Sequence, residues 1–546
     1  MADRSSFIAG GESLAQTQAS YLTTLLERNS DSAFGQKHDF AGVADPVAYR
    51  DIPFMRYDEV AGFDSADYWS TPANYTKDRV SAWFLTSGSS STPKRIPVTS
   101  SLVREKAGAF SLFWDAIYAD HPALKTGKFI ANFGDSGHSA RDANNILEVS
   151  ETTFWNQRMQ GFQASDRWPI PRQITAIESP ALRYYAAARL ALQGELHGMM
   201  GLNPSTLLKF CEVLTNESDR LTSGLKTGNW GILELDTTEL PEKLTSRLQS
   251  NASAADRLTA AASRGGKLQL PDLWPTLELI ISWQSALVGP YLKLLREHSG
   301  GIAYRDYITQ SSECIMAIPM SDNDCGGLLA YQTHFYEFIP EAQTEASHPS
   351  ALCAHELTPG EQYELVVTTG GGLYRYRTAD CMRVVGFENG IPHLSFQYRL
   401  GRTSSITGEK LTEAQVLDAL ASVAAGSPLI RQDVFVHPRT GERPHYALLT
   451  AGSNLKSGTQ DADLALLADR FHSALCAANG EYADKCASLR LGKPSVVIVQ
   501  DQDIQALHQK LRAAHVGDDQ YKPGVLRREH DLDNGMTILR QAHANS

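Results

Sequence analysis

The sequence lacks the features that mark secreted, membrane-spanning and zinc-binding proteins. Its seven cysteines, at positions 211, 314, 325, 353, 381, 476 and 486, form no C-x-x-C pair and no zinc spacing. An odd, scattered set of cysteines is typical of reduced thiols and disfavours a disulfide scaffold. No apolar run reaches the ~18 uninterrupted residues of a membrane span. The N-terminus has neither the basic start nor the apolar core of a signal peptide, so we expect a cytoplasmic protein.

An excess of positive charge is also missing. The chain of 546 residues carries a formal net charge of −12, which disfavours broad binding to nucleic acid or anionic membranes. Hydrophobic residues make up 42% and charged residues 21%, an ordinary globular composition. A chain of this length exceeds one compact core, so we expect two or more domains. We expect neither nucleic acid nor a membrane as a partner, and a monomer or weak homodimer as the assembly.

Short apolar runs rich in β-forming residues alternate with longer helical patterns in the first part of the chain. This alternation predicts an α/β fold with a substantial parallel sheet. The predicted strands are 81–86, 128–133 and 275–282; the predicted helices are 11–29, 101–118 and 180–215, with a polar loop at 31–40.

The pattern changes towards the C-terminus. Residues 362–387 read as paired antiparallel strands around a turn at 370–372. Near residue 400 a strand, a polar hinge and a helix precede further alternating elements, enough for a small α+β domain. We therefore predict a large N-terminal domain, 1–400, and a small C-terminal domain, 401–546. The later elements are predicted at 433–437, 446–450, 461–477, 495–499 and 503–513.

A Ser/Thr-rich loop follows the first predicted strand. Residues 86–94 read TSGSSSTPK, and small hydroxylated residues around a glycine let backbone N–H groups and hydroxyls converge on a phosphate. Lys94 adds a compact positive charge. The second glycine of the nucleotide-binding loop G-x-x-x-x-G-K-[ST] is absent. A Ser-rich surface loop is an equally good interpretation of this segment by itself.

Two further motifs carry carboxylates. Ser311-Ser312-Glu313 supplies a carboxylate suited to Mg²⁺ on nucleotide phosphates, although Ser followed by Glu is also a common helix start. In residues 374–380, YRYRTAD, strand alternation places both arginines on one face and the tyrosines on the other. Asp380 at the end of this run is suited to the hydroxyls of a ribose. The alternative interpretation of residues 374–380 is a strand whose arginines face solvent and whose aspartate lies in a turn.

The order and spacing of these motifs resemble the adenylate-forming superfamily of acyl-CoA synthetases and luciferases. The chain more closely resembles the auxin-responsive Gretchen Hagen family of acyl-acid amido synthetases, over most of its length. Residues 363–369, YELVVTT, with 372–377, GLYRYR, are similar to that family's Y-E-L-V-I-T-T…G-L-x-R-Y-R. Other segments of that family also have similar counterparts in this chain: residues 32–38 (SAFGQKH), residues 52–53 with 57–58, and residues 520–523 (QYKP). The chain departs from the pattern at Ser91, Thr309, Gln310 and Ala379.

The resemblance implies a large nucleotide- and acid-binding domain with a small mobile domain on a hinge. It implies an ATP-dependent ligase that uses Mg²⁺, adenylates a small carboxylic acid and transfers the acyl group to an amine, most simply an amino acid. Two alternatives remain open: transfer to a thiol of coenzyme A or a carrier protein, and a non-catalytic relative that binds nucleotide or acid. The sequence names neither the acid nor the amine.

The resemblance also assigns roles to residues. Lys522, Glu313 and Lys94 are predicted to be catalytic, with Glu313 holding Mg²⁺ and Lys522 reaching the α-phosphate from the small domain. The predicted nucleotide-binding residues are Ser87, Gly88, Ser89, Ser90, Thr309, Ser312, Asp380 and Arg402. The predicted acid pocket comprises Leu182, Tyr185, Arg189 and Trp283, although the spacing of the first three equally suits a buried core stripe.

Overall fold

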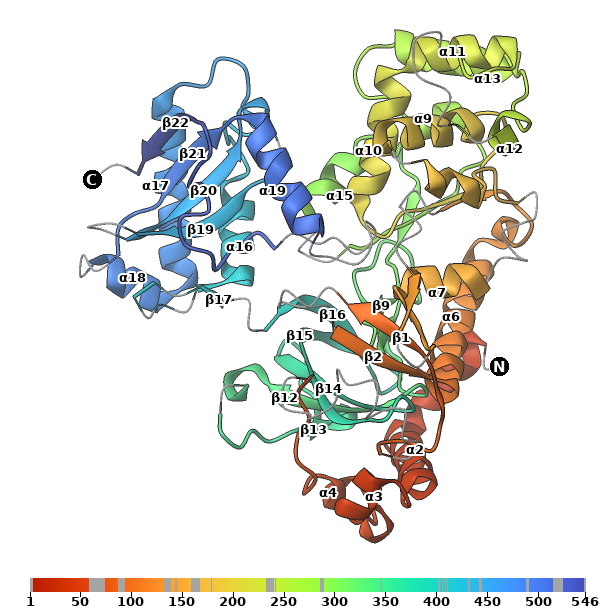
Figure 1. The fold of residues 1–546 in the computed structure, drawn as a ribbon, viewed down its shortest axis with the longest axis vertical. Coiled ribbons are helices and arrows are strands. Elements are labelled where there is room, and N and C mark those ends of the chain that lie inside the picture. Colours follow the sequence, from red (N-terminus) through yellow and green to blue (C-terminus); the bar gives the residue numbers. More distant parts are fainter. Residues whose placement is uncertain are drawn as a thin grey trace. The chain divides into compact units, whose positions relative to one another are not determined.

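The computed structural model resolves into two compact units (Figure 1). The N-terminal unit comprises residues 1–378, 382–396 and 516–520, and the C-terminal unit comprises 379–381, 397–515 and 521–546. The hinge predicted near residue 401 stays a prediction. The structure describes residues 3–57, 74–86, 94–131, 139–142, 145–158, 167–177, 179–231, 240, 242–284, 289–344, 346–400, 403–404, 406–407, 409, 411–430, 433–440, 444–487, 491–513 and 524–544.

A large sheet forms the centre of the N-terminal unit. The run 362–387, predicted to be paired strands, forms β14 (Gln362–Thr369) and β15 (Leu373–Glu388), which are hydrogen-bonded neighbours. Among the described residues, the sheet order is β13-β12-β14-β15-β16-β11-β10-β9. The other bounds are β9 (Thr309–Gln310), β10 (Ile315–Ile318), β11 (Gly327–Leu329), β12 (Phe335–Pro340), β13 (Leu352–Cys353) and β16 (Ile391–Arg399).

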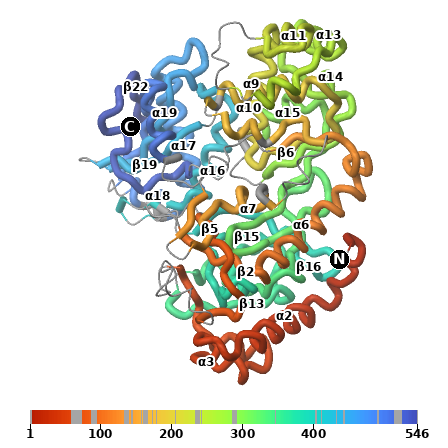
Figure 2. Tube along the Cα trace, turned by 45° about the vertical axis from the view of Figure 1, so that its right-hand side comes forward, coloured from red at the N-terminus to blue at the C-terminus, as the bar shows by residue number. Residues whose placement is uncertain are grey.

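Two long helices cover this sheet, as the apolar periodicity predicts. Helix α2 (Leu14–Asn29) packs on β12, and α6 (Ser100–Asp120) packs on β10 (Figure 2). Buried side chains from both helices join those of the strands in one core. The buried Gln18 amide of α2 donates to the carbonyl of His334 at 2.6 Å, which fixes the helix against the loop before β12.

A parallel sheet and its helices form a second core in this unit. The strands β3 (Phe129–Ile130), β6 (Gly198–Met200), β7 (Leu279–Ile281) and β8 (Ala303–Arg305) pair in parallel in that order. The predicted α/β fold is therefore confirmed. Helices α9 (Pro180–Ala191), α10 (Pro204–Asn216), α11 (Ser218–Thr227), α13 (Ala252–Ser263) and α15 (Gly289–Arg296) surround this core.

Two predictions of local structure are wrong. The single helix predicted over 180–215 is interrupted by β6, because residues 198–201 pair with β3 and β7 instead of continuing the helix. The loop predicted at 31–40 contains the short helix α3 (Ala33–Lys37). Its start is capped by Ser32, whose Oγ accepts from the backbone N–H of Gly35 at 3.0 Å.

A smaller sheet lies beside the Ser/Thr-rich segment. The predicted strand 81–86 is β1 (Val80–Thr86), which pairs antiparallel with β2 (Lys94–Thr99) and parallel with β5 (Leu147–Val149). The edge strand is β4 (Ser139–Arg141). The register places Thr86 opposite Lys94, so the two ends of the segment 87–93 meet across one pair of strands.

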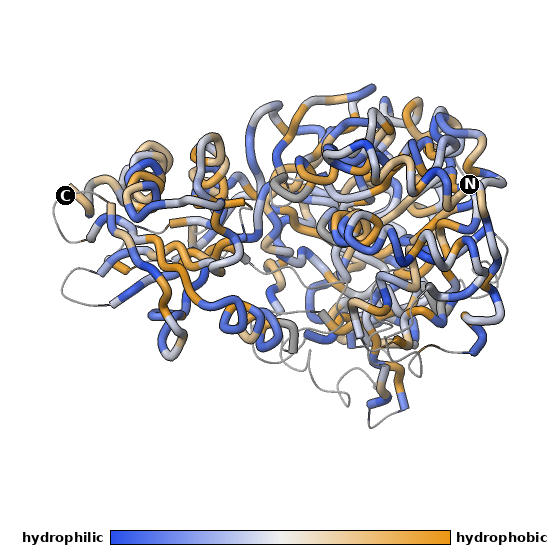
Figure 3. The backbone as a smooth tube through the Cα atoms, turned by 90° about the horizontal axis from the view of Figure 1, so that it is seen from above, coloured by the Kyte–Doolittle hydropathy of each residue, from blue (hydrophilic) through white to orange (hydrophobic). Residues whose placement is uncertain are grey.

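The C-terminal unit is a small α+β structure. Its sheet has the order β19-β20-β21-β22, and helix α17 packs on β21 and β22. Apolar and hydrophilic residues alternate along the helices of this unit, as expected when one face of each is buried (Figure 3). The strands β19, β20 and β21 are instead buried along nearly their whole length. In the part of the chain that the structure describes, no helix is long and apolar enough to cross a membrane. The elements are α16 (Glu413–Val423), β19 (Phe435–Arg439), β20 (His445–Ala451), α17 (Asp461–Ala478), β21 (Ser495–Val499), α19 (Asp501–Ala513) and β22 (Ile538–His543).

Candidate active site

The candidate site begins where the parallel strands end. Strands β7 and β8 end at Ile281 and Arg305, and the chain then continues into residues 282–284 and 306–313. Ligands of open α/β sheets bind outside the carboxyl ends of parallel strands, where loop side chains converge. The second of these segments contains Thr309, half-buried in β9, and the Ser-Ser-Glu motif.

The Ser-Ser-Glu motif forms a tight turn between β9 and β10. The backbone N–H of Ser311 donates to the carbonyl of Cys314 at 2.9 Å, and the N–H of Cys314 donates back at 3.3 Å. No helix begins in this described segment, so the helix-start interpretation is wrong. Ser312 and Glu313 are both buried in the turn.

Glu313 contacts the strand that carries the tyrosine–arginine motif. The hydroxyl of Tyr376, on β15, donates to Glu313 Oε1 at 3.5 Å. Tyr376 is 2% exposed and Glu313 5% exposed. Two motifs separated by 63 positions therefore meet in one buried contact.

A buried ion pair that the sequence analysis missed supports the Ser-Ser-Glu turn. Lys106 of α6 is fully buried, with Nζ 2.7 Å from Glu151 Oε1. The same ammonium donates to the carbonyl of Ser311 at 2.6 Å. Glu151 starts α7 (Glu151–Arg158) directly after β5, and it also accepts from Trp155 Nε1 at 3.2 Å. Lys106 therefore fastens the turn to the sheet that contains β1.

One sequence signal would have found this lysine. Lys106 lies on the same face of its helix as the buried Leu102, Ala109 and Phe113, at helical spacing. A lysine within an apolar stripe is seldom buried without a partner, so its position alone indicates a paired charge.

The two arginines of the tyrosine–arginine motif are structural. Arg375 binds Glu337 through Nη2–Oε1 at 2.8 Å and Nε–Oε2 at 3.0 Å. Arg377 binds Glu364 in the same bidentate manner, with Nε 3.0 Å from Oε1. All four side chains are buried, and burial raises the pKa of Glu337 even though Arg375 opposes that shift. The interpretation of solvated arginines is therefore wrong, because both ion pairs hold β15 within the sheet.

The middle of the same strand has an unusual backbone at Ala379. Ala379 adopts φ of +61°, a left-handed conformation that costs a residue with a Cβ about 1–2 kcal/mol. Its carbonyl accepts from Leu400 N at 2.6 Å, which holds this conformation. Asp380, the next residue, is buried. The glycine that the family pattern has at position 379 fits this conformation without strain.

Lys94 begins β2 beside an aromatic ring. Its Nζ lies 4.7 Å from the centroid of the Tyr57 ring, over its face, a favourable cation–π arrangement. Four of the predicted phosphate-binding residues, Ser87, Gly88, Ser89 and Ser90, lie outside the described residues. Arg402 and Lys522 lie outside them as well.

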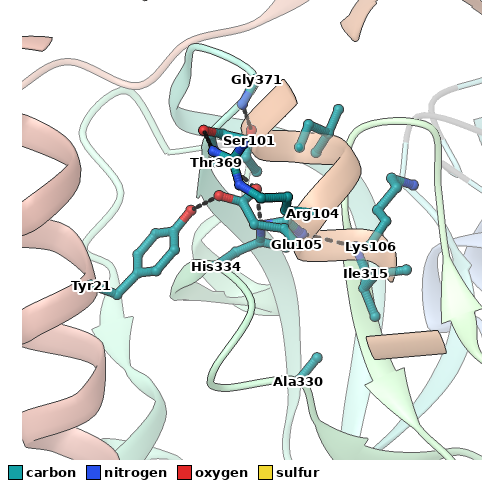
Figure 4. A network of polar contacts seen from close by, with 12 residues as sticks. Tyr21, Ser101, Arg104, Glu105, Lys106, Ile315, Ala330, His334, Thr369 and Gly371 are labelled. Carbon is teal, nitrogen blue, oxygen red and sulfur yellow. Dashed lines mark hydrogen bonds and ion pairs between the residues drawn. The ribbon is translucent and has the colours of Figure 1, made fainter. Parts of the chain in front are cut away.

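A second buried network fixes the turn between β14 and β15 (Figure 4). Glu105 accepts from the Tyr21 hydroxyl at 2.8 Å and from the backbone N–H of Gly370 at 3.1 Å. Burial lowers the pKa of His334, whose Nδ1 lies 3.2 Å from Glu105 Oε2. The other ring nitrogen accepts from Ile315 N at 3.2 Å, so His334 is neutral with its proton on Nδ1. Because Ile315 starts β10 directly after the Ser-Ser-Glu turn, this network also holds the strand that leaves the turn.

Comparison with known proteins identifies the family. Residues 5–304 match the model of the GH3 family N-terminal domain, and residues 327–399 match that of the GH3 family central domain. This chain belongs to the GH3 family. The predicted family and the predicted amide-forming ligase class are thereby confirmed, and membership of this ligase family implies ATP as a co-substrate.

Individual GH3 proteins are similar to this chain at low identity. The indole-3-acetic acid-amido synthetase GH3.15 of Arabidopsis thaliana is 25% identical over 427 residues, covering 74% of this chain and 71% of that protein. The jasmonoyl–L-amino acid synthetase JAR4 of Nicotiana attenuata is 30% identical over 188 residues, or 33% of each chain. The solved structure of the GH3.15 acyl acid amido synthetase with 2,4-DB has a TM-score of 0.83, at 20% identity, over 98% of this chain and 95% of that one. This likeness confirms the fold.

Three of the residues predicted for the acid pocket of this GH3 chain lie on α9, in the second core. Leu182 and Tyr185 are buried in the second core, and the Tyr185 hydroxyl donates to the carbonyl of Trp230 at 2.6 Å. Arg189 is fully buried and donates to the carbonyls of Gly224, Asn229 and Gln249 at 2.7–3.0 Å. These contacts are those of a core stripe, and a role of the three residues in substrate binding stays a prediction. Trp283, by contrast, follows β7 at the carboxyl edge and is only partly buried.

The donors at the Ser-Ser-Glu turn fit Mg²⁺ chemistry. Among the described residues, no group of three or more His, Cys, Asp or Glu side chains could hold a metal ion. A nucleotide-bound Mg²⁺ needs no such group, because it commonly takes one or two protein carboxylates together with phosphates and water. A single buried carboxylate flanked by serine hydroxyls meets that requirement.

Proposed function

We propose that this GH3 protein condenses a small carboxylic acid with an amino acid, through an acyl-adenylate formed from ATP. The contact between Glu313 and Tyr376 is the observation that carries the proposal. It joins the Ser-Ser-Glu turn to the tyrosine–arginine strand at the carboxyl edge of the parallel sheet. The names of the similar proteins, an indole-3-acetic acid-amido synthetase and a jasmonoyl–L-amino acid synthetase, support the same substrate classes.

In the first half-reaction a carboxylate oxygen of the acid attacks the α-phosphorus of ATP. The bond from that phosphorus to the bridging oxygen breaks, and pyrophosphate leaves with its electron pair. An anion approaches a polyanion, so positioning and charge neutralisation lower the barrier. Lys94 supplies positive charge at one end of the segment 87–93, and Ser87, Gly88, Ser89 and Ser90 of that segment bind the phosphates in this proposal.

Glu313 would hold the Mg²⁺ ion, with Ser312 and Thr309 bordering the nucleotide. A bound Mg²⁺ neutralises charge on the phosphate oxygens. The burial of Glu313 strengthens its attraction for a cation, because little water competes in the turn. Asp380 would accept hydrogen bonds from the ribose hydroxyls, and Arg402 would contact the phosphate or ribose.

In the second half-reaction the nitrogen of the amino acid attacks the acyl carbon. The new C–N bond replaces the anhydride C–O bond, AMP leaves, and the nitrogen releases a proton. In this proposal the small C-terminal domain predicted at residues 401–546 turns about a hinge between the two steps. Lys522 then serves the first step and is withdrawn for the second. Trp283 forms one wall of the acid site.

The test is acid-dependent pyrophosphate release. A panel of aryl and alkyl acids is assayed with ATP and Mg²⁺, with and without amino acids, and with hydroxylamine to trap the adenylate. The proposal expects trapping without an amino acid and amide product with one. If product forms only with coenzyme A or another thiol, the acyl acceptor is a thiol and not an amine. If no acid causes pyrophosphate release, the proposal is overturned, and the protein binds nucleotide or acid without catalysing the reaction.

A further inference from the structure

A buried aspartate ties together the two segments that leave the parallel sheet. Asp306 is 4% exposed and is the first residue after β8. Its Oδ1 accepts from the backbone N–H groups of Gln284 at 3.0 Å and Tyr307 at 2.8 Å. Its Oδ2 accepts from the N–H of Gly326 at 2.8 Å. One carboxylate thus satisfies three backbone donors on three different segments.

Two of the three donors belong to segments of the candidate site, and the third precedes a strand of the large sheet. Gln284 follows Trp283 beyond β7, so its N–H lies next to the proposed acid-site wall. Tyr307 leads into residues 309–313, which are proposed to border the nucleotide and hold Mg²⁺. Gly326 precedes β11, the neighbour of β10 in the large sheet, and has φ of +92°. A Cβ there would lie 2.2 Å from the Leu394 carbonyl oxygen, so this third point cannot shift easily.

The segment after β7 is held at several further points. Trp283 N donates to the carbonyl of Leu202 at 2.9 Å, which ties it to the end of β6. The Gln284 side chain accepts from Arg296 Nη2 at 2.9 Å and donates to the carbonyl of Asp324 at 3.1 Å. Asp306 is the group that connects this segment to the one after β8, through side-chain contacts to both.

We propose that Asp306 is a positioning residue that sets the acid-binding wall at Trp283 against the nucleotide-binding segment 309–313. This inference rests on the proposed function. The attacking carboxylate and the α-phosphorus must approach within bonding reach, and a displacement of about 1 Å far from the reacting atoms can cost about 100-fold in rate. A rigid link between the two walls keeps that distance constant, and Asp306 touches neither substrate.

Substitution by asparagine separates the two arms of the clamp. In Asp306→Asn the remaining side-chain oxygen can still accept from two of the N–H groups, but the new amide NH₂ then faces the third donor. The two donors on Oδ1 outweigh the single donor on Oδ2, so the link to Gly326 is the one that Asp306→Asn breaks. Asp306→Ala removes all three acceptor contacts and leaves a cavity.

The experiment measures the KM for the acid, the KM for ATP and kcat of pyrophosphate release in the full chain. We expect Asp306→Ala to raise the acid KM by about 100-fold, with the ATP KM within about 2-fold of the wild type. Asp306→Asn keeps the bonds to the N–H groups of Gln284 and Tyr307, so its acid KM should stay within about 3-fold of the wild type. Leu258→Ala is the control, because Leu258 is fully buried in α13 and belongs to neither of the two linked segments. It should lower Tm without changing the ratio of the two KM values.

The outcomes separate this inference from the function on which it rests. If the wild type shows acid-dependent pyrophosphate release but Asp306→Ala keeps its KM values, the clamp is refuted and the function stands. The clamp would also be refuted if Asp306→Ala raised the KM for the acid and the KM for ATP equally, and Leu258→Ala did the same at an equal loss of Tm. That result would show general damage to the fold. A wild type without acid-dependent release would refute the proposed function first.

Discussion

Lys106 and Glu151 form a buried ion pair, with Nζ 2.7 Å from Oε1, beneath the carbonyl of Ser311. We expect Glu151→Gln to destabilise the protein by about 3–5 kcal/mol, because it leaves the Lys106 charge buried without its counter-charge. The double variant Lys106→Met/Glu151→Gln should recover much of this loss, since neither charge remains. Urea unfolding measures both effects. Glu212→Gln breaks an exposed pair with Lys209 and should change stability by less than about 1 kcal/mol. If Glu151→Gln and Glu212→Gln lowered the free energy of unfolding by similar amounts, burial of the ion pair would not govern the effect.

The carboxylates assigned to the nucleotide should matter for chemistry more than for folding. We expect Glu313→Gln and Asp380→Asn each to reduce adenylation at least ~100-fold, the scale for losing one key electrostatic contact. Circular dichroism should show an intact fold, and pyrophosphate release gives the rate. Glu217→Gln, which breaks an exposed pair with Arg220, serves as the control and should keep the wild-type rate. Near-normal release in both site variants would mean that the nucleotide site is assigned wrongly.

The left-handed residue within β15, Ala379, offers a stabilising substitution. Ala379→Gly should raise the free energy of unfolding by about 1 kcal/mol, since glycine adopts φ of +61° without the Cβ clash. Ala260→Gly is the matched control, because Ala260 is exposed in the interior of α13 and glycine there should destabilise by about 1 kcal/mol. Chemical unfolding of both variants measures the difference. Destabilisation by Ala379→Gly equal to that of the control would contradict the strain at 379.

The Lys522 assignment predicts an asymmetry between half-reactions. Negative charge builds on the α-phosphate only while pyrophosphate leaves, so Lys522→Ala should slow that step strongly. Amide formation from a chemically prepared acyl-adenylate should stay close to normal. Comparing the two assays on one preparation provides the test. Unchanged rates in both would make Lys522 one more solvated lysine, and equal losses would point to general damage of the small domain.

Asp306 predicts a pH dependence of stability. Burial raises its pKa to about 7, with a further rise from Asp324 and opposition from its three backbone donors. Cys325, another titratable group beside it, stays protonated because burial raises its thiol pKa. The folded pKa lies above the unfolded value, so the contribution to stability is greatest below about pH 4 and is lost as pH rises through about 7. The Tm of the wild type relative to Asp306→Asn should therefore be higher at pH 5 than at pH 8. A constant difference would contradict the raised pKa.

The sequence by itself determined the local elements and the family. Apolar periodicity predicted α2, α6, β1 and the strands β19, β20 and β21, because the burial of one face is a property of neighbouring residues. The edge strand β22 was not predicted. The motif around 363–377 is long enough to identify the family without any contact being known. At 180–215 the local pattern predicted one continuous helix, and the prediction was wrong. A short parallel strand between two helices has no periodicity of its own, so the sequence did not reveal β6.

Only the tertiary structure decided which charged groups are structural and which are available for chemistry. In the sequence, Arg375 and Arg377 cannot be distinguished from solvent-exposed arginines. The fold places Glu337 and Glu364 of other strands against them. Lys106 meets Ser311 across 205 positions, and Glu105 meets Gly370 across 265. Such partners come together through the packing of the sheets, and a buried charge is tolerated only where packing supplies one. The energy of each charge therefore depends on segments that no local pattern links.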